Sequence, residues 1–174
     1  SWSPEKSFFQ DVCCPVFDAM DSASVQDMSQ SSGEKFSERY YDTLSKRSEG
    51  HILPAYTILS YLRIHRSSPT HNAVQKFFQT YITARQMCDD LYDWQEDMSK
   101  KHITPISDFL YEKIYKHNNT SYQSLALQEA YHEIYISIDR LLQKSLFHLE
   151  KAGVFIKKSP LEKMIVSLQT SVEH

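Results

Sequence analysis

The sequence predicts an all-α protein, built as a single bundle of about six helices. The chain has 174 residues, of which only three are glycine and six are proline, so few turn signals interrupt it. Apolar residues recur three and four positions apart along most of the chain, which is the spacing of one helix face. No segment shows the alternation of apolar and polar residues that is typical of a half-buried strand.

The composition of the chain limits the classes of protein to which it can belong. Hydrophobic residues make up 41% of the chain and charged residues 24%, a globular profile that suits one domain over residues 1–174. The net charge of −3 argues against a general attraction to nucleic acid or to an anionic membrane, so basic groups would act locally. Cys13, Cys14 and Cys88 do not resemble a disulfide framework. With no signal-peptide pattern and no apolar run of membrane length, we expect a soluble, cytoplasmic protein.

The N-terminal quarter is expected to hold one helix and one loop. Ser3 followed by Pro4 is a helix-start signal, because a hydroxyl cap precedes proline at the first helical position. Pro15 is expected to kink or break this helix. The segment 21–33 is rich in Ser, Asp and Gln, and it is expected to be a loop with one helical turn at most.

The next two helices differ in their apolar pattern. Apolar residues at helical spacing between 36 and 44 predict a helix that ends near Lys46 and Arg47. The segment 52–64 is apolar almost all round, which predicts a central, buried helix with Pro54 in its first turn.

Four more helices are predicted by helical spacing, over 70–98, 107–116, 120–152 and from 159 onward. A basic loop that contains Lys100 and Lys101 follows the first of them. Gly153 is expected to end the helix that precedes it.

The last third of the 70–98 helix carries an acidic segment. Its five carboxylates are Asp89, Asp90, Asp93, Glu96 and Asp97. Residues three and four apart lie over one another on a helix, so Asp89 and Asp93 share one face and repel each other. A bound divalent cation such as Mg²⁺ would reverse the sign of that interaction. The alternative is a solvated acidic face, and we expect Glu96 and Asp97 to be solvated or paired with the two lysines of the basic loop.

The pattern around these aspartates resembles a known motif. Gln86-x-x-Asp89-Asp90-x-x-Asp93 resembles the second aspartate-rich motif of class I isoprenoid diphosphate synthases, a superfamily that includes trans-prenyltransferases, squalene and phytoene synthases and terpene cyclases. The resemblance implies an isoprenoid-synthase-like bundle in which the three aspartates bind Mg²⁺ and are catalytic. It also implies an isoprenoid diphosphate substrate, whose allylic diphosphate is ionised before condensation or cyclisation.

Basic residues extend the resemblance. Lys46 and Arg47 stand where the prenyltransferase branch has a helix that ends in a diphosphate-binding lysine, and Lys101 lies in a loop like the family's basic loop. The resemblance therefore implies that substrate is bound by Lys46 or Arg47, with which of the two left open, together with Lys101 and Gln86. The alternatives are ordinary charges at a helix C-terminus for the basic pair and a hydrogen bond across the bundle for the glutamine.

The chain also departs from the family. The family's site uses two acidic motifs on facing helices, and this sequence shows only one. Asp18 and Asp21 lie too close to Lys46 to serve as the first motif. The resemblance covers residues 30 to 120, the C-terminal half of such a fold, so an upstream domain or a partner chain is expected to supply the other motif. The alternative is a non-catalytic helical subunit or interaction module that pairs with an active synthase.

Overall fold

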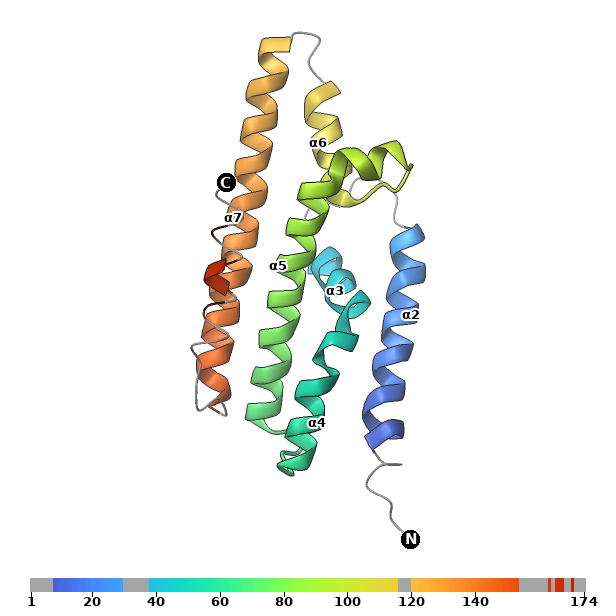
Figure 1. The fold of residues 1–174 in the computed structure, drawn as a ribbon, viewed down its shortest axis with the longest axis vertical. Coiled ribbons are helices and arrows are strands. Elements are labelled where there is room, and N and C mark those ends of the chain that lie inside the picture. Colours follow the sequence, from blue (N-terminus) through green and yellow to red (C-terminus); the bar gives the residue numbers. More distant parts are fainter. Residues whose placement is uncertain are drawn as a thin grey trace.

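The computed structural model describes residues 8–29, 38–115, 120–153, 163, 165–167 and 170. Every regular element in these ranges is helical, which confirms the all-α helical bundle (Figure 1). In chain order they are the π-helical turn η1 (Phe9–Cys13), α2 (Cys14–Ser29), α3 (Glu38–Arg47), the 3₁₀ turn η2 (Glu49–Ile52), α4 (Leu53–Tyr61), α5 (Pro69–Ser99), α6 (Pro105–Tyr115) and α7 (Thr120–Ala152). Among the described residues, no helix combines the length and the apolar character needed to cross a bilayer.

The bundle is organised around α5. This helix runs antiparallel to α7, and the two form the most extensive helix pair of the molecule (Figure 1). On its other side α5 packs against α3 and η2, and α2 packs in turn against α3 and η2. The short helix α6 contacts both α5 and α7 near one end of the bundle.

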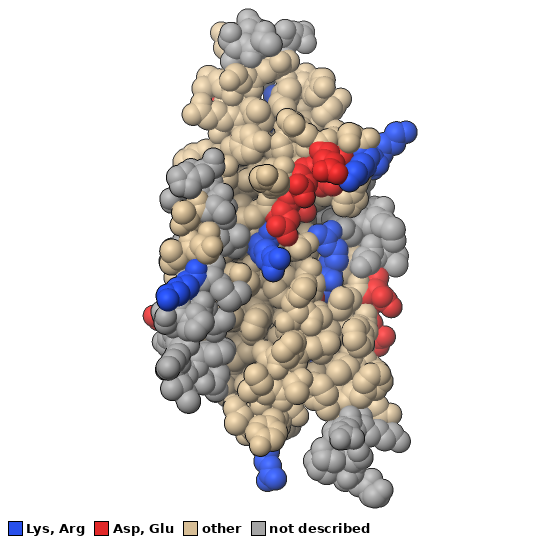
Figure 2. All heavy atoms as spheres, viewed as in Figure 1, with Lys and Arg blue, Asp and Glu red and all other residues tan. Residues whose placement is uncertain are grey.

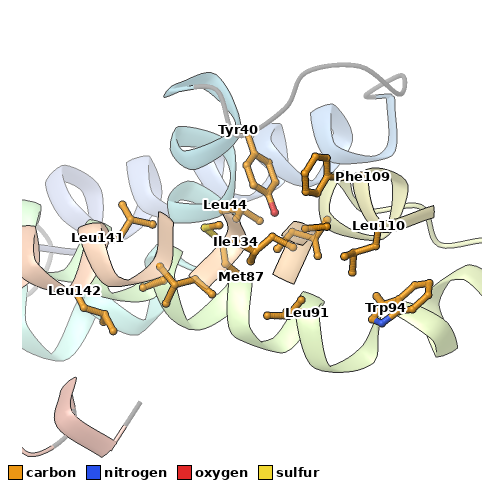
Figure 3. Packing of buried hydrophobic residues seen from close by; sticks show 14 of the residues in the cluster. Tyr40, Leu44, Met87, Leu91, Trp94, Phe109, Leu110, Ile134, Leu141 and Leu142 are labelled. Carbon is orange, nitrogen blue, oxygen red and sulfur yellow. The ribbon is translucent and has the colours of Figure 1, made fainter. Parts of the chain in front are cut away.

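The main core lies between α3, α5, α6 and α7. Its side chains point toward one another from all four helices (Figure 3). Fully burying one such side chain stabilises the fold by about 1.5–3 kcal/mol. Its largest buried members include Tyr40, Leu44, Phe77, Met87, Ile106, Leu110, Ile134, Ile138 and Leu142.

The chain stays helical through Pro15, so the predicted break is absent. Proline has no backbone N–H, so Pro15 cannot donate the usual helical hydrogen bond to the carbonyl oxygen of Asp11, four residues earlier. Arg66 Nη1 donates a hydrogen bond to that oxygen. Directly before the proline, η1 widens the helix so that the N–H of Cys14 donates to the carbonyl of Phe9.

The predicted loop over 21–33 is wrong where the structure describes it, because α2 continues to Ser29. The rest of that segment lies outside the described residues. Met20 and Ala23 extend the apolar stripe of the helix at a three-residue spacing, and this stripe packs inward despite the polar composition around it. A Cβ atom on Gly50 would lie 3.1 Å from the sulfur of Met20, so the glycine permits the close approach of η2 to α2.

The segment 52–64 forms a shorter and less buried helix than its composition predicts. The structure has η2 followed by α4, and Pro54 lies in the first turn of α4 as expected. Tyr56 and Leu59 are buried against η1 and α5, but the opposite face of α4 meets solvent because the helix lies at the edge of the bundle. The exposed large apolar side chains are Ile58, Tyr61 and, directly after the helix, Leu62.

The remaining helices agree with their predictions where they are described. Ser68 caps α5 by accepting a hydrogen bond from the N–H of His71 at 3.1 Å. At the start of α6, the Thr104 N–H donates to Ser107 Oγ at 2.8 Å and the Ser107 N–H donates to Thr104 Oγ1 at 3.1 Å. Gly153, with φ of 63°, follows the last residue of α7. The predicted start of the final helix at 159 lies outside the described residues, and Ile165 within it is buried.

Candidate functional site

Asp89 and Asp93 lie one helical turn apart on α5, and both side chains are exposed. Side chains at this spacing share one helix face. Figure 2 shows a continuous stripe of acidic atoms across the upper part of this face, with basic atoms at both of its ends. The structure therefore brings these two predicted residues together at the surface.

The opposite face of the same turns is held in the core. Met87, Leu91 and Trp94 are buried there (Figure 3). Trp94 Nε1 also donates a hydrogen bond to the hydroxyl of Tyr131 on α7 at 2.9 Å. These contacts fix the rotation of α5, so the face that carries the aspartate pair is directed away from α7.

Asp90 is separated from the other two aspartates. Its side chain is only 8% exposed, and its Oδ2 accepts a hydrogen bond from the hydroxyl of Tyr40 at 3.3 Å. Tyr40 belongs to α3, so this contact joins α3 to α5 through a buried carboxylate. Successive residues on a helix point about 100° apart, which is why the neighbour of Asp89 faces a different helix.

Arg47 connects the end of α3 to the acidic segment. Its Nη2 donates a hydrogen bond to Oε1 of Gln86, which lies one turn before Asp89 on α5. Lys46 is directed elsewhere, because its Nζ lies 2.6 Å from Oδ2 of Asp42. Of the two basic residues at the end of α3, Arg47 is therefore the one beside the acidic segment.

The carboxyl group of Asp89 is in an unfavourable setting for a negative charge. Although the side chain reaches solvent, partial burial raises the pKa of Asp89 above its ordinary value, and the nearby charge of Asp93 raises it further. Arg85 and Arg47 act in the opposite direction on the same pKa. An added cation between the two carboxylates would relieve their repulsion.

The C-terminal end of the acidic stripe is neutralised locally. Glu96 pairs with Lys100 one turn later, as the sequence predicts, whereas Asp97 Oδ1 lies 3.4 Å from Nδ1 of His102. Lys101 is exposed in the following turn with φ of 61°, and it forms no ion pair with a described residue. The structure therefore does not bring Lys101 to the aspartate pair.

The donor set limits what metal the site could take. Within the ranges that the structure describes, no three His, Cys, Asp or Glu side chains are grouped so that they could hold a metal ion. Mg²⁺ often binds through one or two carboxylates, with water and substrate phosphates completing its shell. Asp89 and Asp93 fit a magnesium ion shared with a phosphate ligand better than one held by protein atoms alone.

Two residues of this region were not recognised from the sequence. Arg85 precedes Asp89 by four residues, and that spacing alone could have placed it on the same face. Tyr40 is the other, and its contact with Asp90, fifty positions away, leaves no local signal in the sequence.

Comparison with known proteins identifies no family for the chain. No protein-family model matches the chain, and no curated protein or solved structure matches it. The residues of α3 and α5 are therefore the features from which a function can be inferred.

Proposed function

We propose that this protein is an isoprenoid-synthase-like domain that binds Mg²⁺ and the diphosphate group of a prenyl substrate on the outer face of α5. One observation carries the proposal: Asp89 and Asp93 share an exposed face with Arg85, and Arg47 reaches the same region from α3. The resemblance of residues 86–93 to the aspartate-rich motif of class I isoprenoid diphosphate synthases supports it.

The chemistry requires carboxylates and cations side by side. Loss of an allylic diphosphate builds negative charge on oxygen, and Mg²⁺ held by Asp89 and Asp93 would neutralise part of that charge. Arg47 and Arg85 offer planar guanidinium groups that can donate two parallel hydrogen bonds to phosphate oxygens. Gln86 accepts a hydrogen bond from Arg47 and so orients its guanidinium beside the aspartates.

The proposal assigns different roles to the other predicted residues. Asp90 accepts a hydrogen bond from Tyr40 and so anchors the first turn of α3, the helix that ends in Arg47, against α5. Lys46, which pairs with Asp42, and Lys101, which stands in the exposed turn after α5, would contribute long-range positive charge to an incoming diphosphate.

A complete synthase site needs a second acidic motif. We assign that motif to an upstream domain or a partner chain, so that ionisation of the substrate would take place between the two. Cys13, Cys14 and Cys88 are free thiols, which suits a reducing, cytoplasmic setting.

A second candidate function is favoured by the surface of α7. Large apolar side chains recur along its exposed face. Leu125, Ile136 and Phe147 follow one another at a spacing of eleven residues, which is close to three full helical turns and so keeps them on one face. Such a stripe suits a non-catalytic helical subunit that pairs with an active synthase. Its members are Tyr122, Leu125, Ile136 and Phe147.

Thermal unfolding tests the proposal. Mg²⁺ together with a non-hydrolysable prenyl diphosphate analogue at saturating concentration should raise the Tm of the wild-type chain by about 5–10 °C. The double variant Asp89→Asn/Asp93→Asn should lose this rise. Glu96→Gln is the matched control, because it removes a charge from the same stripe at a site paired with Lys100. A wild-type Tm that does not respond would contradict the proposal.

A further inference from the structure

One end of the bundle is markedly basic, although the whole chain has a net charge of −3. No acidic residue occurs between Glu49 and Asp89, a stretch that forms α4 and most of α5. The turn between these two helices lies at the lower end of the molecule in Figure 1, near the end of α7. The basic residues of the stretch are Arg63, Arg66, Lys76 and Arg85.

The segment 58–66, which we call the α4 tip, combines apolar and basic exposure. Tyr61 is 87% exposed, Ile58 60% and Leu62 54%. The side chains of Arg63 and Arg66, which follow them in the chain, are exposed as well. Clustered large apolar side chains of this kind on a protein surface mark an interaction site.

A second basic group lies between α5 and α7 at the same end of the bundle. Lys76, Lys144 and Lys151 all lie near His148, whose pKa is lowered first by burial and then by these three charges. Lys151 Nζ also lies 4.3 Å from the ring centre of Phe147, which is itself exposed. At this end of the bundle, basic residues therefore occur together with exposed apolar side chains in two places, the α4 tip and the group between α5 and α7.

Few acidic groups of the described residues oppose these cations. Glu150 of α7 and Asp11 of η1 are exposed, and the backbone carbonyl of Asp11 accepts a hydrogen bond from Arg66. Glu49 is buried with its Oε1 3.5 Å from the hydroxyl of Tyr56. On the face shown in Figure 2, basic atoms project at the lower end and no acidic atoms of the described residues appear there.

We propose that the α4 tip is a peripheral docking site for an anionic membrane surface. Tyr61 and Leu62 would enter the interface between headgroups and acyl chains, and Arg63 would contact lipid headgroups. A small group of exposed apolar side chains with cations nearby in the chain fits a fluid interface, since it needs no shaped groove in a partner. Tyrosine is also enriched at the level of the headgroups.

Vesicle sedimentation tests this docking site in the absence of Mg²⁺ and prenyl diphosphate, so its outcome is separate from that of the proposed function. The wild-type chain should sediment with phosphatidylcholine vesicles that contain phosphatidylserine, and it should stay in solution with phosphatidylcholine alone. Raising the salt concentration should release it. Equal binding to both kinds of vesicle, or binding to neither, would overturn the proposal.

Matched variants locate the contact. Tyr61→Ser/Leu62→Ser should weaken binding to the anionic vesicles at least about tenfold. Tyr92→Ser is the control, because Tyr92 is 89% exposed and lies on the distant part of α5. Unchanged binding by the double variant, with helix content confirmed by circular dichroism, would contradict insertion of the tip.

To test how much the charge of Arg63 contributes to vesicle binding, the substituted residue must be able to adopt the same backbone conformation. Arg63 has φ of 57°, a left-handed conformation that asparagine tolerates better than most residues. Arg63→Asn should therefore remove the charge without strain and weaken binding about fivefold. If Arg63→Asn binds anionic vesicles as tightly as the wild type, the assigned headgroup contact is wrong.

Discussion

The hydroxyl of Tyr40 donates a hydrogen bond to the carboxylate of Asp90 across the packed contact between α3 and α5, over 3.3 Å. Both side chains are buried, at 1% and 8% exposure. This bond attaches the first turn of α3 to α5, and the bond from Arg47 to Gln86 attaches the last residue of α3 beside the acidic segment. The bond from Tyr40 also removes Asp90 from the surface that Asp89 and Asp93 share.

Tyr40→Phe should lower the free energy of unfolding by about 1–3 kcal/mol, because a buried carboxylate loses a donor. Chemical denaturation of the two proteins measures the difference. Tyr92→Phe provides the control, since it removes an equivalent hydroxyl from an 89% exposed ring and should leave stability unchanged. Equal stability of Tyr40→Phe and the wild type would show that the bond contributes nothing.

Asp93→Asn should lower the pKa of Asp89, because the charge of Asp93 raises that pKa in the folded protein. An NMR titration of the Asp89 carboxyl group in both proteins measures the shift. A pKa of Asp89 that is the same in Asp93→Asn would mean that the two carboxylates do not interact.

Without ligand, Asp89→Asn should also be more stable than the wild type at neutral pH. A carboxyl group whose folded pKa is raised binds protons more tightly in the folded state, so its contribution is favourable at low pH. That contribution is lost as the pH rises from the ordinary value of 3.8 through the raised pKa. Denaturation of both proteins at pH 7 tests the sign, and a less stable variant would contradict it.

His71 should make stability sensitive to acid. Its ring is buried and stacks on Tyr56 with centroids 5.0 Å apart, its Nδ1 has no hydrogen-bond partner among the described residues, and burial lowers its pKa below 6.5. The unfolded chain then binds the proton more readily, so stability falls as the pH drops below about 6.5. His71→Phe, which keeps the stacking, should reduce this fall in pH-dependent denaturation curves. Superimposable denaturation curves for the two proteins would rule out His71 as the source of the acid sensitivity.

Arg47→Ala should weaken binding of a Mg²⁺–diphosphate ligand more than Lys46→Ala does. Arg47 lies beside Gln86 and Asp89, whereas Lys46 is paired with Asp42. We expect a loss of about tenfold or more for the arginine variant, the size of one charge-assisted hydrogen bond. Titration calorimetry on both variants decides between them, and a larger loss for Lys46→Ala would reverse the assignment.

The sequence was sufficient to predict the long helices α5 and α7. Their apolar residues recur over many turns, and local signals such as the Ser68 cap and Gly153 mark their ends. The polar half of α2 was missed because Ala23, a small residue, continues its buried stripe. The exposure of α4 was missed because composition does not reveal that a helix lies at the edge of a bundle.

The site was predictable only in part, for similar reasons. Helical spacing alone places Asp89 and Asp93 on one face. Which helix the neighbouring Asp90 faces depends on how α3 packs against α5, and that depends on residues far apart in the sequence. The same packing decides that Arg47, and not Lys46, lies beside Gln86.

The central claim is that a divalent cation binds at Asp89 and Asp93 together with a diphosphate. The most direct measurement replaces Mg²⁺ with paramagnetic Mn²⁺ and records backbone NMR spectra in the presence of a non-hydrolysable prenyl diphosphate analogue. We predict that amide signals of α5 around these two aspartates broaden selectively, and that Asp89→Asn/Asp93→Asn abolishes the effect. Broadening centred on another part of the chain, or none at all, would contradict the claim.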